Sequence, residues 1–333
     1  MKDIAEQTGL GLATVSSYFN GGNVREKNRI KIEKAIDDLH FEINETARGL
    51  KTNRTKTIGV ILPELNNLFF AEVIIAAEDM LRSNGYATIV CDYRSDSERE
   101  KEAADFLLHR RVDGLIFFPQ GAGSEVVRKF EEAQKPVVLL DRRLPGDACS
   151  CVLVDNEVAA KDAVRRFLAA GHTKIGIIKG PENVYTARER YQGYCRALRE
   201  AGIKPDEDLV QEGGYILEGG SQAMRKLWEK NPDMTAVFAS NYDMTVGAMI
   251  EINDLGIRVP DQLSVIGFDC VDFARATMPR LSIVTQPTAE MGRSAARILL
   301  AHLQNSEKSG DVSKGETVCL KTGFLEGESV KQI

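Results

Sequence analysis

The sequence contains no apolar run that approaches the roughly 20 residues needed to span a membrane. Its first ten residues, MKDIAEQTGL, also lack the apolar stretch of a secretion signal. We therefore expect a cytoplasmic protein. Hydrophobic residues nonetheless make up 43% of the 333 residues, which is enough for two or three domains with cores of their own.

Groups that commonly carry chemistry are scarce. The six cysteines form no CxxC pair, and the four histidines, His40, His109, His172 and His302, match no metal-ligand spacing. The chain contains no GxSxG, HExxH or GxxxxGK[ST] motif, and no GxGxxG follows the first predicted strand. We therefore expect neither an enzyme nor a bound metal or cofactor.

A surplus of positive charge is also missing, because the formal net charge is −6. A protein that coats nucleic acid over its whole surface carries the opposite balance. Any contact with DNA must therefore be confined to one part of the chain.

From Lys56 onward, short β-branched runs alternate with amphipathic stretches of about a dozen residues, as is typical of βαβ units around parallel sheets. The predicted strands are residues 57–62, 86–92, 113–118, 136–141, 174–180, 235–240 and 263–269. Within one predicted helix, Ser97 and Glu100 have the spacing of a capping box. The alternation pauses at residues 149–155 and 282–292, where we expect the chain to cross between two lobes.

The first part of the chain differs in kind, because it has three helical stretches and no β-rich run. We predict a multidomain protein with a small all-α head and a two-lobed α/β core built on parallel sheets. The head is expected at residues 1–45, a hinge and linker at 46–56, and the core at 57–333. In the core, one lobe is expected at about 57–153 and 287–317 and the other at about 154–285 and 318–333.

The segment GLGLATVSSYFNGG, residues 9–22, follows the predicted helix DIAEQT directly. Ile4 gives that helix an apolar face, Gly9 permits a sharp turn, and Val15 and Phe19 give the next helix an inward face. The pattern predicts a helix-turn-helix head. Three helices packed only for stability are the alternative.

The stretch DIAEQTGLGLATVSSYFNGG, followed by NETARGL, closely resembles the head of the lactose/galactose repressor family of bacterial transcription regulators. The remainder resembles that family's two-lobed core, which is similar to periplasmic sugar-binding proteins. The resemblance therefore covers nearly the whole chain. It implies that the second helix lies in the major groove of DNA and that a hinge helix after the third enters the minor groove.

The resemblance and the local charge pattern together predict a set of DNA-contacting residues. These are Leu12, Ala13, Thr14, Ser16, Ser17, Asn20, Arg29, Ala47 and Leu50. Ser17 stands where the family usually has an Arg that reads a base, so we expect a changed preference at one base pair, worth about 1–3 kcal/mol. Leu50 would be the apolar wedge between base steps, although its segment read alone is a polar linker.

The charges of residues 1–51 sum to zero, which weakens a DNA argument made from composition alone. The placement of the charges supports DNA binding in part. Four basic residues cluster at the start of the third helix, where cations oppose the helix dipole: Arg25, Lys27, Arg29 and Lys31. A phosphate backbone would compensate this arrangement. A solvated charged face is the alternative.

Ligands of open parallel sheets lie outside the carboxyl ends of the strands, and this rule selects Asp92, Asp141, Asn241 and Asp269. The family resemblance implies a sugar-type effector pocket that includes more residues than these four. Its predicted residues are Phe69, Phe70, Asp141, Arg142, Arg190, Tyr215, Asn241, Asp269 and Gln286. Each could instead be an ordinary capping or salt-bridging residue. Tyr242 occupies a position where the family often has Asp, and its phenol is expected to narrow or block part of the pocket.

These observations favour a sequence-specific DNA-binding regulator, in the first instance a repressor, controlled by a small effector held between the core lobes. The resemblance implies three partners: a pseudopalindromic operator, a sugar or sugar derivative, and a second copy of the chain in a homodimer. The alternative is a cytoplasmic sugar-binding module without a DNA function.

Overall fold

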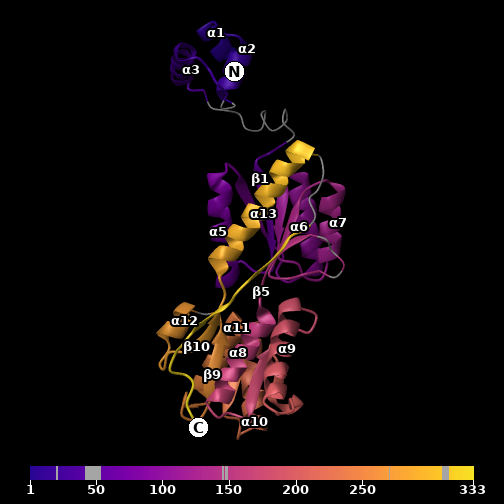
Figure 1. The fold of residues 1–333 in the computed structure, drawn as a ribbon, viewed down its shortest axis with the longest axis vertical. Helices are drawn as coiled ribbons and strands as arrows, with labels where there is room; N and C mark the ends of the chain where they lie inside the picture. Colours follow the sequence, from indigo (N-terminus) through magenta and orange to yellow (C-terminus); the bar gives the residue numbers. More distant parts are fainter. Residues whose placement is uncertain (20–21, 42–53, 145, 147–148, 270, 310–314) are drawn as a thin grey trace. The chain divides into compact units, whose positions relative to one another are not determined.

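The structure is a computed structural model that describes residues 1–19, 22–41, 54–144, 146, 149–269, 271–309 and 315–333. The chain divides into two compact units, Met1–Thr55 and Lys56–Ile333 (Figure 1). The expected hinge and linker at 46–56 lie almost entirely outside the described residues. Within the described ranges, no helix is long and apolar enough to cross a membrane.

The first unit contains the three expected helices, α1 (Lys2–Thr8), α2 (Leu12–Phe19) and α3 (Glu26–Asp38). Gly9 ends α1 in the left-handed conformation, with φ of 65°, and its N–H donates to the carbonyl of Glu6. Glycine adopts this conformation without the steric cost that a Cβ adds. The buried residues of the unit are Ile4, Val15, Ile32 and Ala35.

The first lobe of the second unit is a parallel sheet with the strand order β11-β5-β4-β3-β1-β2. Its strands are β1 (Thr57–Leu62), β2 (Ala87–Asp92), β3 (Gly114–Phe117), β4 (Val137–Leu140), β5 (Ser150–Val154) and β11 (Thr317–Leu320). Its helices are α5 (Leu68–Ser83), α6 (Ser97–His109), α7 (Gly123–Glu132) and α13 (Thr288–Ser309). Two separate apolar clusters cover the two faces of the sheet, one with α5 and α13 and the other with α6 and α7.

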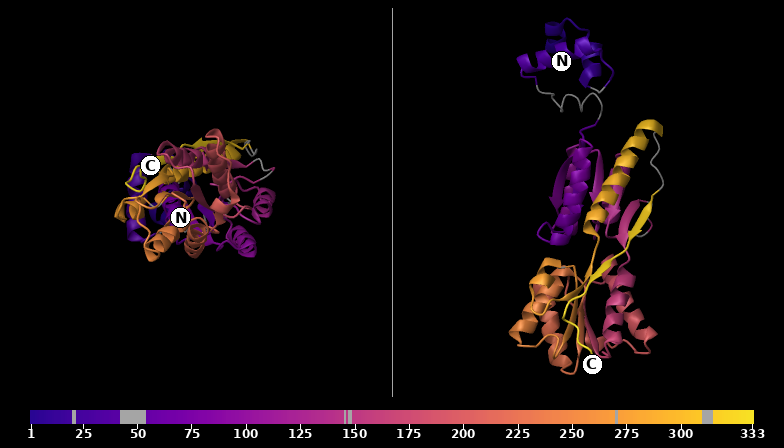
Figure 2. Two further views of the ribbon diagram at one scale, coloured as in Figure 1. Left: turned by 90° about the horizontal axis from the view of Figure 1, so that it is seen from below. Right: turned by 60° about the vertical axis from the view of Figure 1, so that its left-hand side comes forward.

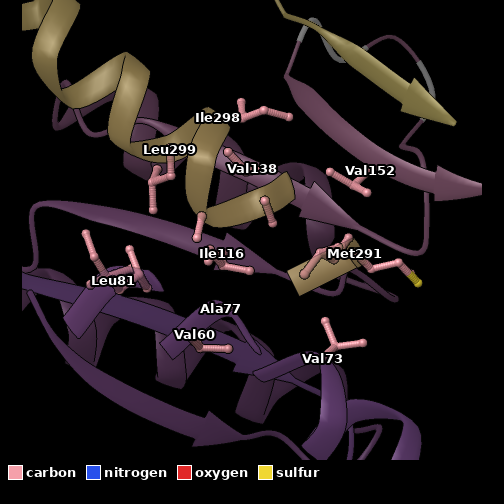
Figure 3. Packing of buried hydrophobic residues seen from close by; sticks show 14 of the residues in the cluster. Val60, Val73, Ala77, Leu81, Ile116, Val138, Val152, Met291, Ile298 and Leu299 are labelled. Carbon is pink, nitrogen blue, oxygen red and sulfur yellow. The ribbon is translucent and has the colours of Figure 1, made fainter. Parts of the chain in front are cut away.

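Figure 3 shows how α5 and α13 cover one face of this sheet. Val73 and Leu81 of α5 and Leu299 of α13 point toward the strand residues Val60 and Val138, and all five are buried. The strands are buried on both faces, which is why they read in the sequence as continuous apolar runs rather than as alternating ones.

The second lobe has the strand order β12-β10-β9-β8-β6-β7, in which only the pairing of β10 with β12 is antiparallel. Its strands are β6 (Ile175–Lys179), β7 (Val210–Glu212), β8 (Ala236–Ala239), β9 (Ser264–Phe268), β10 (Ser282–Thr285) and β12 (Gly323–Leu325). Its helices are α8 (Asn156–Ala169), α9 (Tyr185–Glu200), α10 (Leu217–Lys230), α11 (Tyr242–Asp254) and α12 (Val271–Ala276), with a short 3-10 helix at Glu207–Leu209. Again, one cluster forms with α8 and α9 and another with α10 and α11.

All seven predicted strands are present, each within one residue of its expected ends. Two of the missed strands, β5 and β10, lie in the segments that were interpreted as pauses. The chain does cross between the lobes there, because β5 is followed by α8 of the second lobe and β10 by α13 of the first.

The chain crosses between the lobes a third time, and it does so at a later residue than predicted. β11 pairs with β5 from Thr317 to Leu320, and the side chains of Val318 and Leu320 pack against the first lobe's core. Residues 318–320 therefore belong to the first lobe, not the second. Figure 2 shows the C-terminal segment, in yellow, continuing from there into the second lobe.

The expected capping box at the start of α6 is also wrong. The N-cap is Asp96, whose side chain accepts from the backbone N–H groups of Glu98 and Arg99. Glu100 instead turns inward and is fully buried.

Candidate functional site

The second unit contains a cavity of about 150 Å³ lined by residues of both lobes. All nine residues predicted for an effector pocket line it, although they come from seven different elements and loops. The two sheets share one strand order, although β11 is parallel to β5 and β12 is antiparallel to β10, and residues just past the carboxyl ends of their strands line the cavity. Parallel sheets of this kind bind ligands where the strand order reverses.

Several cavity residues lie just past the end of a strand. Asp141 directly follows β4, Asp269 directly follows β9 and Asn241 lies two residues past β8, so these three residues selected by the carboxyl-end rule line the cavity. Asn241 also caps α11, since its side-chain oxygen accepts from the N–H of Met244 at 2.9 Å. Asp92, which the same rule selected, does not line this cavity: it ends the edge strand β2, and its carboxylate accepts from the backbone N–H groups of Leu65 and Arg94.

Three of the nine predicted cavity residues have a left-handed backbone, with φ of 65° at Asp141, 62° at Tyr215 and 63° at Asp269. Aspartate tolerates this conformation better than most residues, whereas tyrosine rarely adopts it. The Tyr215 ring lies against Gly180, where any Cβ would overlap the ring. Backbone strain of this kind is retained where the surrounding structure and the function require it.

Arg190, on α9, is held rigidly by its own lobe. Its Nε donates to Asn156 Oδ1 at 2.8 Å, and its terminal nitrogen donates to the Ser240 carbonyl at 2.7 Å. The guanidinium lies 3.7 Å above the ring centre of Phe268. Two of its five N–H donors are thus engaged within the lobe, and these two bonds fix the orientation of the guanidinium.

Asp141 and Arg142 form a buried pair, with 3.7 Å between Arg142 Nε and the Asp141 carboxylate. The Arg142 terminal nitrogen also donates to the Pro119 carbonyl at 3.1 Å. Burial raises the pKa of Asp141, and the nearby guanidinium groups of Arg142 and Arg190 oppose that rise.

Three polar atoms of this cavity are buried without a hydrogen-bond partner among the described residues. They are Asp141 Oδ1, Arg142 Nε and Gln286 Oε1, which make two acceptors and one donor. Leaving such groups unsatisfied costs about 1–3 kcal/mol each, so they suit a ligand that supplies matching groups. Hydroxyl groups both donate and accept, and fit this set.

The cavity also carries an acidic surplus. Glu64, Asp141 and Asp269 line it together with only two basic residues, Arg142 and Arg190. Burial raises the pKa of Asp269 to about 7, against the opposing effects of Arg190 and of the hydrogen bond donated by Gln286 at 2.9 Å. The carboxylates balance the two guanidinium groups, so the cavity offers an anionic ligand no surplus of positive charge, and a neutral, hydroxyl-rich ligand needs none.

Two further residues shape the site and were missed in the sequence. The Glu100 carboxylate accepts from the N–H groups of Gln120 and Ala122 at 2.7 and 2.6 Å, which fixes the loop that brings Gln120 to the cavity. The only sequence pattern that singled out Glu100 was its spacing to Ser97, and that pattern predicted a helix cap rather than a bond to this loop.

Asn67 was missed as well. Its side-chain oxygen caps α5 by accepting from the Phe69 N–H, and its Nδ2 donates to Asp243 Oδ2 of the other lobe at 2.7 Å. No sequence pattern could reveal this bond, because 176 residues separate its partners.

In the first unit, α2 presents part of the predicted DNA-contacting set to solvent. Leu12 is 50% exposed and Ala13 is also exposed, whereas Thr14, Ser16 and Ser17 are half-buried. Val15 points into the core. The predicted contacts Asn20, Ala47 and Leu50 lie outside the described residues.

Arg29, on α3, is exposed and forms an ion pair with Glu33 at 3.0 Å. Arg25 directly precedes α3 as its N-cap, so the basic cluster does lie at the helix start. A phosphate near Arg29 would compete with Glu33 for the guanidinium.

Comparisons with known proteins agree with this arrangement. Residues 55–321 match the family model described as periplasmic binding proteins and sugar binding domain of LacI family. The chain is 32% identical to catabolite control protein A of Priestia megaterium over 303 residues, which covers 90% of this chain and 91% of that protein. It is also 32% identical to the transcriptional repressor CytR of Escherichia coli K12 over 305 residues, covering 91% and 89%.

Two solved structures extend the similarity to nearly the whole chain. The lac repressor dimer bound to operator and the anti-inducer ONPF has a TM-score of 0.85 and 26% identity, with 99% of this chain and 98% of that one covered. The complex of the regulator CelR with cellobiose has a TM-score of 0.76 and 29% identity, with 98% of both chains covered.

Proposed function

The chain belongs to the LacI family of transcription regulators, and we propose on this premise that it is a cytoplasmic, homodimeric DNA-binding regulator whose operator affinity is set by a neutral sugar in the core cavity. The observation that carries the proposal is that nine residues selected from the sequence line a single cavity with unsatisfied polar atoms and an acidic surplus. An enzymatic role has no support, since the relatives named above are regulators.

We propose that α2 reads the operator in the major groove through Leu12, Ala13, Thr14 and Ser16. A two-fold dimer then binds two half-sites about one helical turn apart. Footprinting on the promoter of its own gene tests this role at moderate salt. A protected two-fold-related site is expected, and its absence would favour the alternative of a sugar-binding module without a DNA function.

Replacing Ser17 by Arg is expected to change which operator is preferred, not whether DNA is bound. A guanidinium at this position could grip a guanine edge, which discriminates by about 1–3 kcal/mol, or about 5–150-fold at one base pair. Binding selection from a randomised half-site measures the preference of both proteins. An identical consensus for both would remove Ser17 from the reading surface.

The affinity of the sugar is expected to increase as the pH rises through about 7. Asp269 has its pKa raised to about 7, so it is mostly protonated at pH 6 and mostly ionised at pH 8. A sugar hydroxyl that donates to this carboxylate favours the ionised form, so binding below pH 7 releases a proton. Isothermal titration between pH 6 and 8, in buffers of different ionisation enthalpy, measures both effects. Asp269→Asn should bind more weakly and without the pH dependence.

The bond between Asn67 and Asp243 gives the two lobes a direct link beside the cavity. Asp243→Ala is expected to change the ratio of operator affinities with and without sugar by several-fold, because coupling between sites is typically worth about 1–3 kcal/mol. Anisotropy titrations with labelled operator measure this ratio. Glu218→Ala is the matched control, because it also removes an acidic residue from the first turn of a helix, here α10. It should leave the ratio unchanged.

A further inference from the structure

A second hollow, of about 260 Å³, adjoins the cavity described above. The two hollows share four lining residues, Phe69, Tyr242, Asp269 and Gln286. They therefore lie side by side, and we call the first, of about 150 Å³, the inner compartment and the second, of about 260 Å³, the outer compartment.

The two compartments differ in chemistry. The inner one holds the three unpartnered buried atoms of Asp141, Arg142 and Gln286. The outer one adds the apolar side chains of Leu68, Val271 and Phe273, together with the polar residues Glu72, Asp272 and Thr288. Leu68 and Val271 are 50% and 42% exposed, so their apolar surface is available to a ligand.

The volumes of the two compartments also indicate that a ligand occupies both. Sites for drug-sized ligands usually measure about 300–1,000 Å³, and neither compartment alone reaches that range. The two together fall within it. A single sugar ring in the inner compartment would leave the apolar surface at Leu68 and Val271 uncovered.

We propose that the effector is a neutral glycoside of two joined rings, with a sugar ring in the inner compartment and a second ring in the outer compartment against Leu68 and Val271. The inference rests on the proposed function of the cavity. Phe69 and Tyr242 line both compartments and therefore stand at their junction. Tyr242, the departure from the family pattern, then selects for the second ring rather than blocking the pocket.

Matched pairs of ligands test the proposal by isothermal titration with the full chain. Glucose is compared with cellobiose, maltose and trehalose, and ribose with uridine and cytidine. We expect at least one two-ring compound to bind at least 10-fold more tightly than its single-ring counterpart. Val271→Asp and Tyr242→Ala should each reduce this gain.

Val158→Asp is the matched control, because Val158 is 47% exposed on α8 and lines neither compartment. It should preserve the gain in full. Any of three results overturns the two-ring proposal. They are equal affinity within every pair, a gain that persists in both Val271→Asp and Tyr242→Ala, and no binding by any two-ring compound.

Operator titrations separate this outcome from failure of the proposed function. If glucose or ribose alters operator affinity but no second ring adds to its binding, the function stands and the two-ring effector is refuted. If a two-ring compound binds with the expected gain and leaves operator affinity unchanged, the compartments are assigned correctly and the regulatory role is refuted.

Discussion

Asp141→Asn is expected to weaken binding of the effector sugar by about 100-fold and to leave operator affinity in the absence of sugar unchanged. The substitution keeps the shape of the side chain, and asparagine tolerates the left-handed backbone of this position. Its amide, however, can place a donor where the carboxylate presents a buried, unpartnered acceptor. Loss of a hydrogen bond to a charged group costs about 1.5–3 kcal/mol, and the upper value corresponds to about 100-fold.

Isothermal titration with the tightest-binding sugar of the panel measures the first effect, and operator titration with and without that sugar measures the second. Asp233→Asn is the control, because Asp233 is exposed and pairs with Lys174 away from the cavity. Asp141→Ala is a poorer test, since alanine in the left-handed conformation adds a cost of about 1–2 kcal/mol to the folded state. Unchanged sugar affinity in Asp141→Asn would remove this carboxylate from the binding site.

Val15→Asp is expected to abolish operator binding, with a loss of at least about 1,000-fold, and to leave sugar binding intact. Val15 is one of four buried hydrophobic residues among those that the structure describes in the first unit. An ionised carboxylate cannot be buried there without several kcal/mol of desolvation cost, and so small a domain has little stability to lose. The core is a separate compact unit, so its unfolding midpoint should not move.

Anisotropy with labelled operator measures the loss, and calorimetry of the core with and without sugar provides the internal control. Leu12→Ala, on the exposed side of the same helix, is the matched variant. It should preserve the fold of the head, seen by circular dichroism, while reducing operator discrimination. Operator binding by Val15→Asp at the wild-type level would show that the head is not the DNA-binding unit.

The strands that the sequence revealed contain a run of apolar residues, even where the strand is as short as β4, VVLL. β1, TIGVIL, is buried at five of its six positions and was placed at its observed ends. β7 and β12 have three residues each, which is too short for any periodicity to be recognised. β5, SCVLV, is entirely buried, but its Ser and Cys residues interrupt the β-branched pattern on which the prediction relied.

For the site, reasoning from the ends of strands found Asp141, Asn241 and Asp269, and the resemblance supplied the residues on helices, such as Arg190. Neither approach could find Glu100, because its importance depends on a loop that follows a different strand. Contacts between distant segments are invisible until the chain is folded. The unpartnered atoms, which carry the strongest information on the ligand, are likewise a property of the packed structure alone.

The order in which the ribosome delivers the chain has a consequence for both lobes. The edge strand β11 and the long helix α13 of the first lobe arrive after the second lobe has almost been synthesised, and β12 of the second lobe arrives later still. The first sheet therefore cannot be completed until β11 has been synthesised, nor the second until β12 has. A premature stop between β10 and β11 would release a chain in which β5 and β10 each have a strand edge that the complete sheets pair, and such edges promote aggregation.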